Sequence, residues 1–175
     1  LLWSDQHLQE PLSKSWNMPR YWILPISGLN KGSNEILVYV QGYSFQNAGL
    51  GKIEFNNVLV NSQKHLGEIW DRRTLFQMNM IFSAMIGIIC FIVWQFRRSE
   101  TTFGWLALSS FLWILFISNV LTTESFPFRS SIAASKANML CFIAYIHCVS
   151  LYLIRFLKQR FKYVERGFIL ITLLF

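Results

Sequence analysis

Cysteine and proline are both scarce in this chain of 175 residues, and their positions exclude several architectures. The three cysteines, Cys90, Cys141 and Cys148, all lie within long apolar runs, so a disulfide-bonded extracellular scaffold is not expected. The four prolines lie outside those runs, which leaves the runs free to form unbroken helices. Hydrophobic residues, in contrast, make up 53% of the chain, which is typical of a membrane protein.

The motifs of catalysis are also missing. The chain has no Walker loop, no GxSxG elbow, no HExxH pair and no CxxC pair. The histidines, His7, His65 and His147, are scattered and do not have the spacing of metal ligands. We therefore expect no catalytic residue, no cofactor and no metal site within this sequence.

Long apolar runs fill the C-terminal part of the chain, and charged residues flank each of them. A hydrocarbon core of ~30 Å is crossed by about 20 apolar residues in a helix. We predict a transmembrane domain over residues 75–175, with helices at about 75–96, 103–121, 132–157 and the start of a fourth at 167–175. Because the chain begins with Leu1 and ends inside an apolar run, we expect an internal piece of a longer protein.

Basic residues gather after the first and third runs, whereas the loop between the second and third holds only Arg129. By the positive-inside rule, the two basic loops face the cytoplasm of a bacterial cell, and residues 1–74 face the periplasm. Arg72 and Arg73, which precede the first run, oppose this orientation but are outnumbered. The net charge of +7 thus reflects topology and contact with membrane lipids, with no basic face for nucleic acid. The topology-setting residues are Arg97, Arg98, Arg155, Lys158, Arg160, Lys162 and Arg166.

Residues 1–62 show the pattern of a β-domain, with alternating side chains and turns rich in Gly and Asn. The predicted strands are residues 21–24, 34–43, 51–55 and 58–60. We predict a mixed fold, in which the C-terminal part of an extracytoplasmic antiparallel β-sandwich is followed by an α-helical transmembrane bundle. Residues 63–74 are expected to form a connector of helical character that enters the first run without a flexible linker.

Four polar side chains fall inside the apolar runs. Asn79 and Ser83 share a face of the first run, and Lys136 and His147 lie on one stripe of the third, eleven residues apart. One hypothesis is a polar seam that couples the helices, with His147 titrating near neutral pH. The alternative is structural: Lys136 extends to the headgroups, and His147 bonds a neighbouring backbone group.

Short motifs in the N-terminal part resemble those of a known family. Residues 22–25 (WILP), a turn with Leu29, Gly32 and Asn34, and residues 38–40 (VYV) resemble the periplasmic galactose-binding-like sandwich of certain bacterial sensors. The membrane part is similar to the bacterial seven-transmembrane receptors with diverse intracellular signalling modules. The matching segments are residues 49–51 (GLG), 70–73 (WDRR), 97–100 (RRSE), 103–108 (FGWLAL) and 126–128 (FPF).

The resemblance implies further spans and a cytoplasmic output domain, above all a two-component sensor histidine kinase, with a diguanylate cyclase as the alternative. It also implies a homodimer, an unidentified extracytoplasmic ligand with carbohydrate as one candidate, and a cytoplasmic response regulator if the output is a kinase. A transporter subunit is a second alternative. A transporter is expected to have broken helices and charged residues along its pathway. The apolar runs disfavour it, because they contain no proline and few charged residues.

Overall fold

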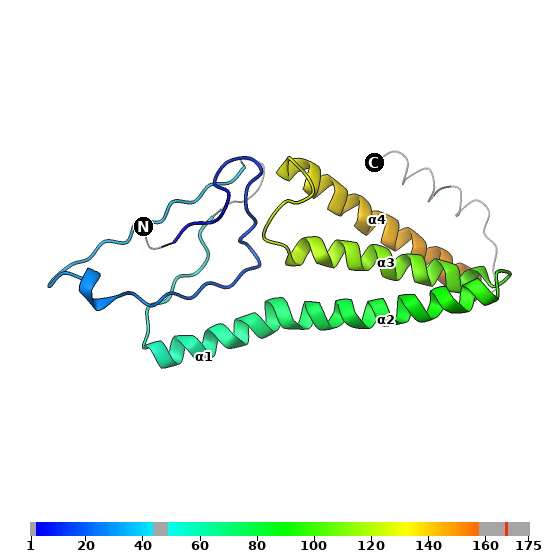
Figure 1. Ribbon diagram of the computed structural model, residues 1–175, viewed down its shortest axis with the longest axis horizontal. Coiled ribbons are helices and arrows are strands. Elements are labelled where there is room, and N and C mark those ends of the chain that lie inside the picture. The colour runs from blue at the N-terminus through cyan, green and yellow to red at the C-terminus, as the bar shows by residue number, and fades with distance from the viewer. Residues whose placement is uncertain (1–2, 44–48, 158–166, 168–175) are drawn as a thin grey trace.

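The computed structural model describes residues 3–43, 49–157 and 167, and within them every regular element is helical (Figure 1). In chain order these elements are the 3-10 turn η1 (Ile26–Gly28), α1 (Val58–Ile69), the π-helical turn η2 (Trp70–Thr74), α2 (Leu75–Phe96), α3 (Thr101–Leu121) and α4 (Ser131–Phe156).

Three of the helices are long and apolar enough to cross a membrane, as the sequence predicts. They begin and end within two residues of the predicted bounds for the first three spans. Their outward faces carry large apolar side chains; Ile81, Phe82 and Ile88 of α2, for example, are each more than half exposed in the isolated chain. Such side chains are suited to lipid. Of the predicted fourth span, all but Gly167 lies outside the described residues.

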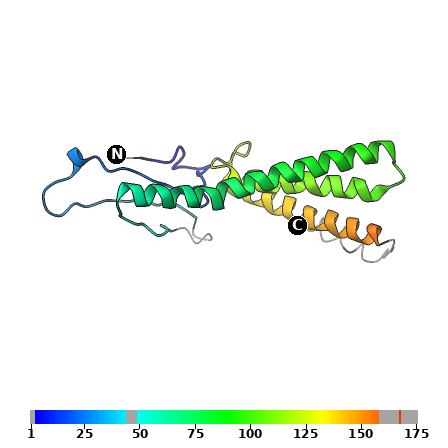
Figure 2. The same cartoon turned by 90° about the horizontal axis from the view of Figure 1, so that it is seen from below.

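The first spanning helix is the end of a much longer rod. α1, η2 and α2 run on without a break from Val58 to Phe96, over 39 residues (Figure 2). The side chain of Asn57 starts the rod by accepting the N–H of Leu59 at 3.1 Å. At ~1.5 Å per residue the rod measures about 58 Å, nearly twice the ~30 Å hydrocarbon core. Its α1 end therefore extends beyond the bilayer.

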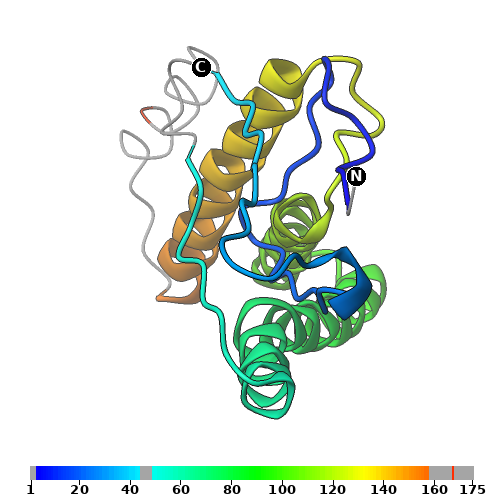
Figure 3. The ribbon, with the colours of Figure 1, turned by 90° about the vertical axis from the view of Figure 1, so that its left-hand side faces the viewer.

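The bundle is built on α3, against which α2 and α4 each pack lengthwise (Figure 3). Small side chains allow this close approach: a Cβ added to Gly87 of α2 would lie 2.9 Å from the Cβ of Ser110 on α3. Ala107 of α3 and Ala134 of α4 are likewise buried. Small residues are what helix interfaces in lipid need, because association there depends on close packing.

The predicted β-sandwich is wrong. In the described part of residues 1–62 there is no strand, and residues 34–43 run as extended chain without a paired neighbour. Their side chains are not packed into a core, since Leu37 is 86% and Tyr39 75% exposed. Residues 58–60, predicted as a strand, form the first turn of α1. A strand is stable only when its N–H and C=O groups pair across a ladder, and alternating side chains alone do not supply that partner.

Candidate functional site

The N-terminal residues 5–20, here called the docked segment, lie against the end of the bundle where α2 begins and α3 ends (Figure 1). They bind the α3–α4 loop, residues 122–130, through hydrogen bonds between groups far apart in sequence. The N–H of Lys14 donates to the carbonyl of Thr123 at 2.6 Å, and the hydroxyl of Ser125 donates to the carbonyl of Leu12 at 3.4 Å. The loop and the docked segment thus hold one another in place.

Glu10 of the docked segment caps the third spanning helix. Its carboxylate accepts the N–H of Ser131, the first residue of α4, at 2.6 Å, while the hydroxyl of Ser131 accepts the N–H of Leu12 at 2.8 Å. Ser130, the residue in the N-cap position, makes no side-chain cap of its own. A carboxylate at a helix N-terminus satisfies an unpaired N–H and favours the positive end of the helix dipole. The start of α4 therefore depends on a residue 121 positions earlier.

Four residues connect the docked segment to η2, and η2 to the end of α3; we call Asn17, Arg72, Arg73 and Leu121 the helix junction. The side-chain amide of Asn17, which is only 8% exposed, donates to the carbonyl of Arg72 at 3.2 Å. The guanidinium of Arg73 donates to the carbonyl of Leu121, the last residue of α3, at 2.6 Å. A cation at this point also meets the negative end of the α3 dipole.

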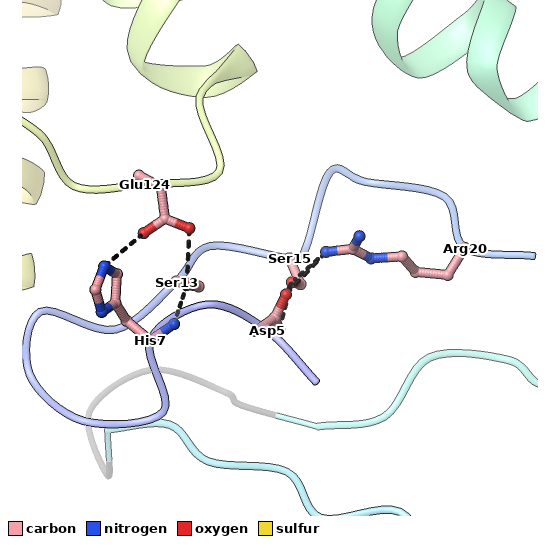
Figure 4. A network of polar contacts seen from close by, with 6 residues as sticks. All are labelled: Asp5, His7, Ser13, Ser15, Arg20 and Glu124. Carbon is pink, nitrogen blue, oxygen red and sulfur yellow. Dashed lines mark hydrogen bonds and ion pairs between the residues drawn. The ribbon is translucent and has the colours of Figure 1, made fainter. Parts of the chain in front are cut away.

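Polar side chains within the docked segment hold its shape (Figure 4). The carboxylate of Asp5 pairs with Arg20 at 2.8 Å and accepts the hydroxyl of Ser15 at 2.7 Å. Glu124 of the α3–α4 loop anchors a second group, because it accepts the hydroxyl of Ser13 at 2.9 Å and lies 3.8 Å from the imidazole of His7. This second group ties the segment to the loop that it covers.

Lys14 adds a charged contact from the docked segment to the last turn of α3. Its ammonium donates to the side-chain carbonyl of Asn119 at 2.7 Å. Burial at this contact lowers the pKa of Lys14, because a charged amine loses hydration there. The contact reinforces the link between the segment and α3, next to Leu121 of the helix junction.

The four polar residues predicted within the spans fall into two groups. Asn79 and Ser83 of α2 both line a pocket between the helices, and Asn79 accepts the indole N–H of Trp113 on α3 at 2.6 Å. Lys136 and His147 of α4 do not line that pocket. Tyr145 does line it, and at 3.6 residues per turn both Lys136 and His147 lie on the opposite side of α4 from Tyr145. The structure therefore does not bring the four together into one seam.

The described topology-setting residues lie at the far end of the bundle from the helix junction. Arg97 and Arg98 follow α2, and Arg98 stacks on the ring of Trp94 at 4.4 Å. Arg155 in the last turn of α4 donates to the hydroxyl of Thr101 at the start of α3, at 2.9 Å. Lys158, Arg160, Lys162 and Arg166 lie outside the described residues.

Sequence reasoning missed the docked segment and the helix junction entirely. Asn17 and Glu10 sit in a polar, irregular stretch whose partners are 55 and 121 residues away. The only signal was the pair Arg72 and Arg73, which opposes the charge rule for orientation. A basic residue at this position has a structural role, since Arg73 donates to a terminal carbonyl of α3 that would otherwise lack a partner.

The site consists of hydrogen bonds that hold helices and loops together. Among the described residues, no group of three or more His, Cys, Asp or Glu side chains is placed to hold a metal ion. The helix junction instead joins the docked segment to the start of one spanning helix, and joins that start to the end of another. Comparisons with protein-family models, with curated proteins and with solved structures gave no match.

Proposed function

We propose that this chain is the input and transmembrane portion of a bacterial signalling receptor in the inner membrane, with residues 1–74 in the periplasm. It relays an extracytoplasmic signal to a cytoplasmic output domain elsewhere in the protein, above all a two-component sensor histidine kinase. A diguanylate cyclase is the alternative output. The receptor acts as a homodimer and, if a kinase, passes its phosphoryl group to a response regulator.

The helix junction is the observation that carries this proposal. The docked segment contacts the carbonyl of Arg72 in η2, and η2 continues directly into α2. A change in the docked segment therefore acts on a stiff helix without an intervening flexible loop. The π-helical turn at this point supports the same idea, because such turns interrupt the regular backbone ladder and recur at functional positions.

The mechanism requires two arrangements of the bundle that the signal distinguishes. A ligand shifts an equilibrium only by its difference in affinity for the two states. In one state Arg73 holds the end of α3 against the start of α2, through the carbonyl of Leu121. In the other this bond is broken, and α2 is free to shift along α3. The exposed indole rings of Trp16 and Trp22 are candidates for contact with the extracytoplasmic ligand, for which carbohydrate is one class.

The transporter alternative has less support. Transport pathways often use broken helices that expose backbone groups at the membrane midplane. The described spanning helices are continuous through that depth, and none contains proline. What this bundle offers is contact between whole helices, which suits relay of a shift more than passage of a solute.

The test uses neighbouring arginines of the full-length protein in lipid nanodiscs. Arg73→Ala removes the bond to α3, whereas Arg72→Ala is a matched control, because the side chain of Arg72 takes part in no described hydrogen bond and its carbonyl is kept. With labelled ATP, we expect the wild type to phosphorylate itself on histidine. We expect Arg73→Ala to change that basal rate about threefold or more, and Arg72→Ala to leave it unchanged; a net loss of ~1 kcal/mol for one hydrogen bond corresponds to about fivefold.

Each other outcome counts against part of the proposal. Formation of cyclic dinucleotide from GTP, without phosphorylation, replaces the kinase with the cyclase. Equal rates in both arginine variants overturn the role of the helix junction in coupling. Absence of both activities in the full-length protein overturns the signalling function.

A further inference from the structure

A pocket of about 380 Å³ lies on the flank of the bundle, at the depth of the membrane. Residues of α2, α3 and α4 all line it, because α2 and α4 both pack on α3 and leave a groove over that helix. Ser83 is about 12 Å along α2 from its start, and Tyr145 is about 21 Å along α4, at ~1.5 Å per residue. Both positions fall within the ~30 Å hydrocarbon core. Pockets for small molecules typically hold about 300–1,000 Å³, so the size is sufficient for a ligand.

Three hydroxyl groups around this pocket have no hydrogen-bond partner among the described residues: those of Ser83, Tyr145 and Tyr152. Other polar groups in the lining satisfy one another. Ser110 donates to the carbonyl of Leu106 at 3.0 Å, for example. An unpaired polar group is costly inside a bilayer, where no water is present to replace the partner. Ser83 and Tyr145 lie at that depth, and Tyr152 lies nearer the end of α4; together the three hydroxyls favour a ligand with acceptor atoms.

Aromatic rings form much of the remaining wall. The ring centroids of Trp113 and Tyr145 lie 4.8 Å apart, with the two rings tilted by 36°. Because the indole N–H of Trp113 is already bonded to Asn79, its ring contributes an apolar face to the pocket. Aromatic rings pack favourably against other aromatic rings, either offset-stacked or edge to face.

We propose that this pocket binds an aromatic, lipid-soluble molecule that carries one or more hydrogen-bond-accepting oxygen atoms and enters from the bilayer. The rings take its apolar body, and the hydroxyls of Ser83, Tyr145 and Tyr152 donate to its oxygens. This binding goes beyond the signalling function proposed above and does not rest on it, because occupancy of the pocket is measured without any output activity.

The test uses benzophenone with the full-length protein in lipid nanodiscs. Benzophenone is a diaryl ketone with one acceptor oxygen, and near-ultraviolet light cross-links it to neighbouring C–H bonds, so mass spectrometry locates it. We expect saturable labelling of the α2, α3 and α4 peptides that line the pocket. Ser83→Leu fills the pocket and should reduce that labelling about tenfold or more. Ser135→Leu makes the same change on an exposed part of α4 outside the pocket and should leave it unaltered.

Tyr145→Phe provides a second variant that keeps the ring and removes only a donor. A hydrogen bond worth ~1 kcal/mol predicts that half-saturation requires about fivefold more benzophenone. Labelling that never saturates and spreads evenly over the lipid-facing side of α2 would overturn the proposal. So would complete absence of label from the pocket, because another part of the protein would then fill it. Equal losses in the Ser83 and Ser135 variants would also overturn it.

Discussion

At the scale of single residues, Glu54 shows how the extended chain is fastened to α1. Its carboxylate accepts the ammonium of Lys52 at 2.6 Å and also that of Lys64, which lies on the helix. These two hydrogen bonds, first from Lys52 and then from Lys64, lower the pKa of Glu54 from 4.5 to about 2. The same pairing raises the pKa of Lys52. Glu54 therefore links the extended chain before α1 to Lys64 on that helix.

The first prediction concerns this carboxylate. Because its pKa is lower in the folded protein, its contribution to stability is fully present above pH 4.5 and is lost as the pH falls through about 2. Lys64→Met should raise the pKa of Glu54 while leaving it below 4.5, since Lys52 still donates. Carbon-13 NMR titration of the labelled carboxyl group measures the value. Lys31→Met, at an exposed residue without a described ion pair, is the control and should change nothing. An unchanged pKa in the Lys64 variant would contradict the pairing.

At the scale of elements, the spans could be predicted from the sequence and the extramembrane structure could not. A helix satisfies its hydrogen bonds locally, so the length and apolar character of residues 75–96 were sufficient to place α2. A strand needs a partner, and the alternation in residues 34–43 carries no information on whether one is present. Glu10 and Asn17 depend on contacts with residues far along the chain, which a single sequence does not reveal.

In the pocket, Asn79 and Ser83 were identified by their shared helix face, whereas Trp113 and the tyrosines were not.

The contact between α2 and α3 gives the next prediction. A methyl group at Gly87 would lie 2.9 Å from the Cβ of Ser110, too close for the two helices to keep their positions. Gly87→Ala should therefore destabilise the bundle by about 1–3 kcal/mol, as overpacking does. Gly67→Ala in α1 is the matched control: its added methyl group meets nothing within 4 Å, and alanine favours a helix by ~1 kcal/mol. Unfolding in mixed detergent micelles measures both. Equal stability of the two variants would show that the helices are not in close contact at Gly87.

At the scale of the whole molecule, the chain has two distinct ends. The helix junction, the docked segment and the α3–α4 loop share one end, and Arg97, Arg98 and Arg155 share the other. The order of three antiparallel helices makes this division unavoidable, because the α2–α3 loop and the end of α4 must meet. The hydrogen bond from Arg155 to Thr101 joins the end of α4 to the start of α3 and shows that they meet. Only the direction of the bundle across the membrane remains to be set by charge.

The positive-inside rule sets that direction, and accessibility measures it. Basic residues in short loops stay on the cytoplasmic side, so Ser99, beside Arg97 and Arg98, should be inside and Gln41 outside. A membrane-impermeant charged maleimide added to intact spheroplasts should label Gln41→Cys and miss Ser99→Cys until the membrane is permeabilised. The native cysteines lie in the spanning helices, two of them buried, and provide the unlabelled background. The reverse pattern would turn the docked segment to the cytoplasm. The helix junction would then face the cell interior, and a relay from the periplasm would be physically impossible along this path.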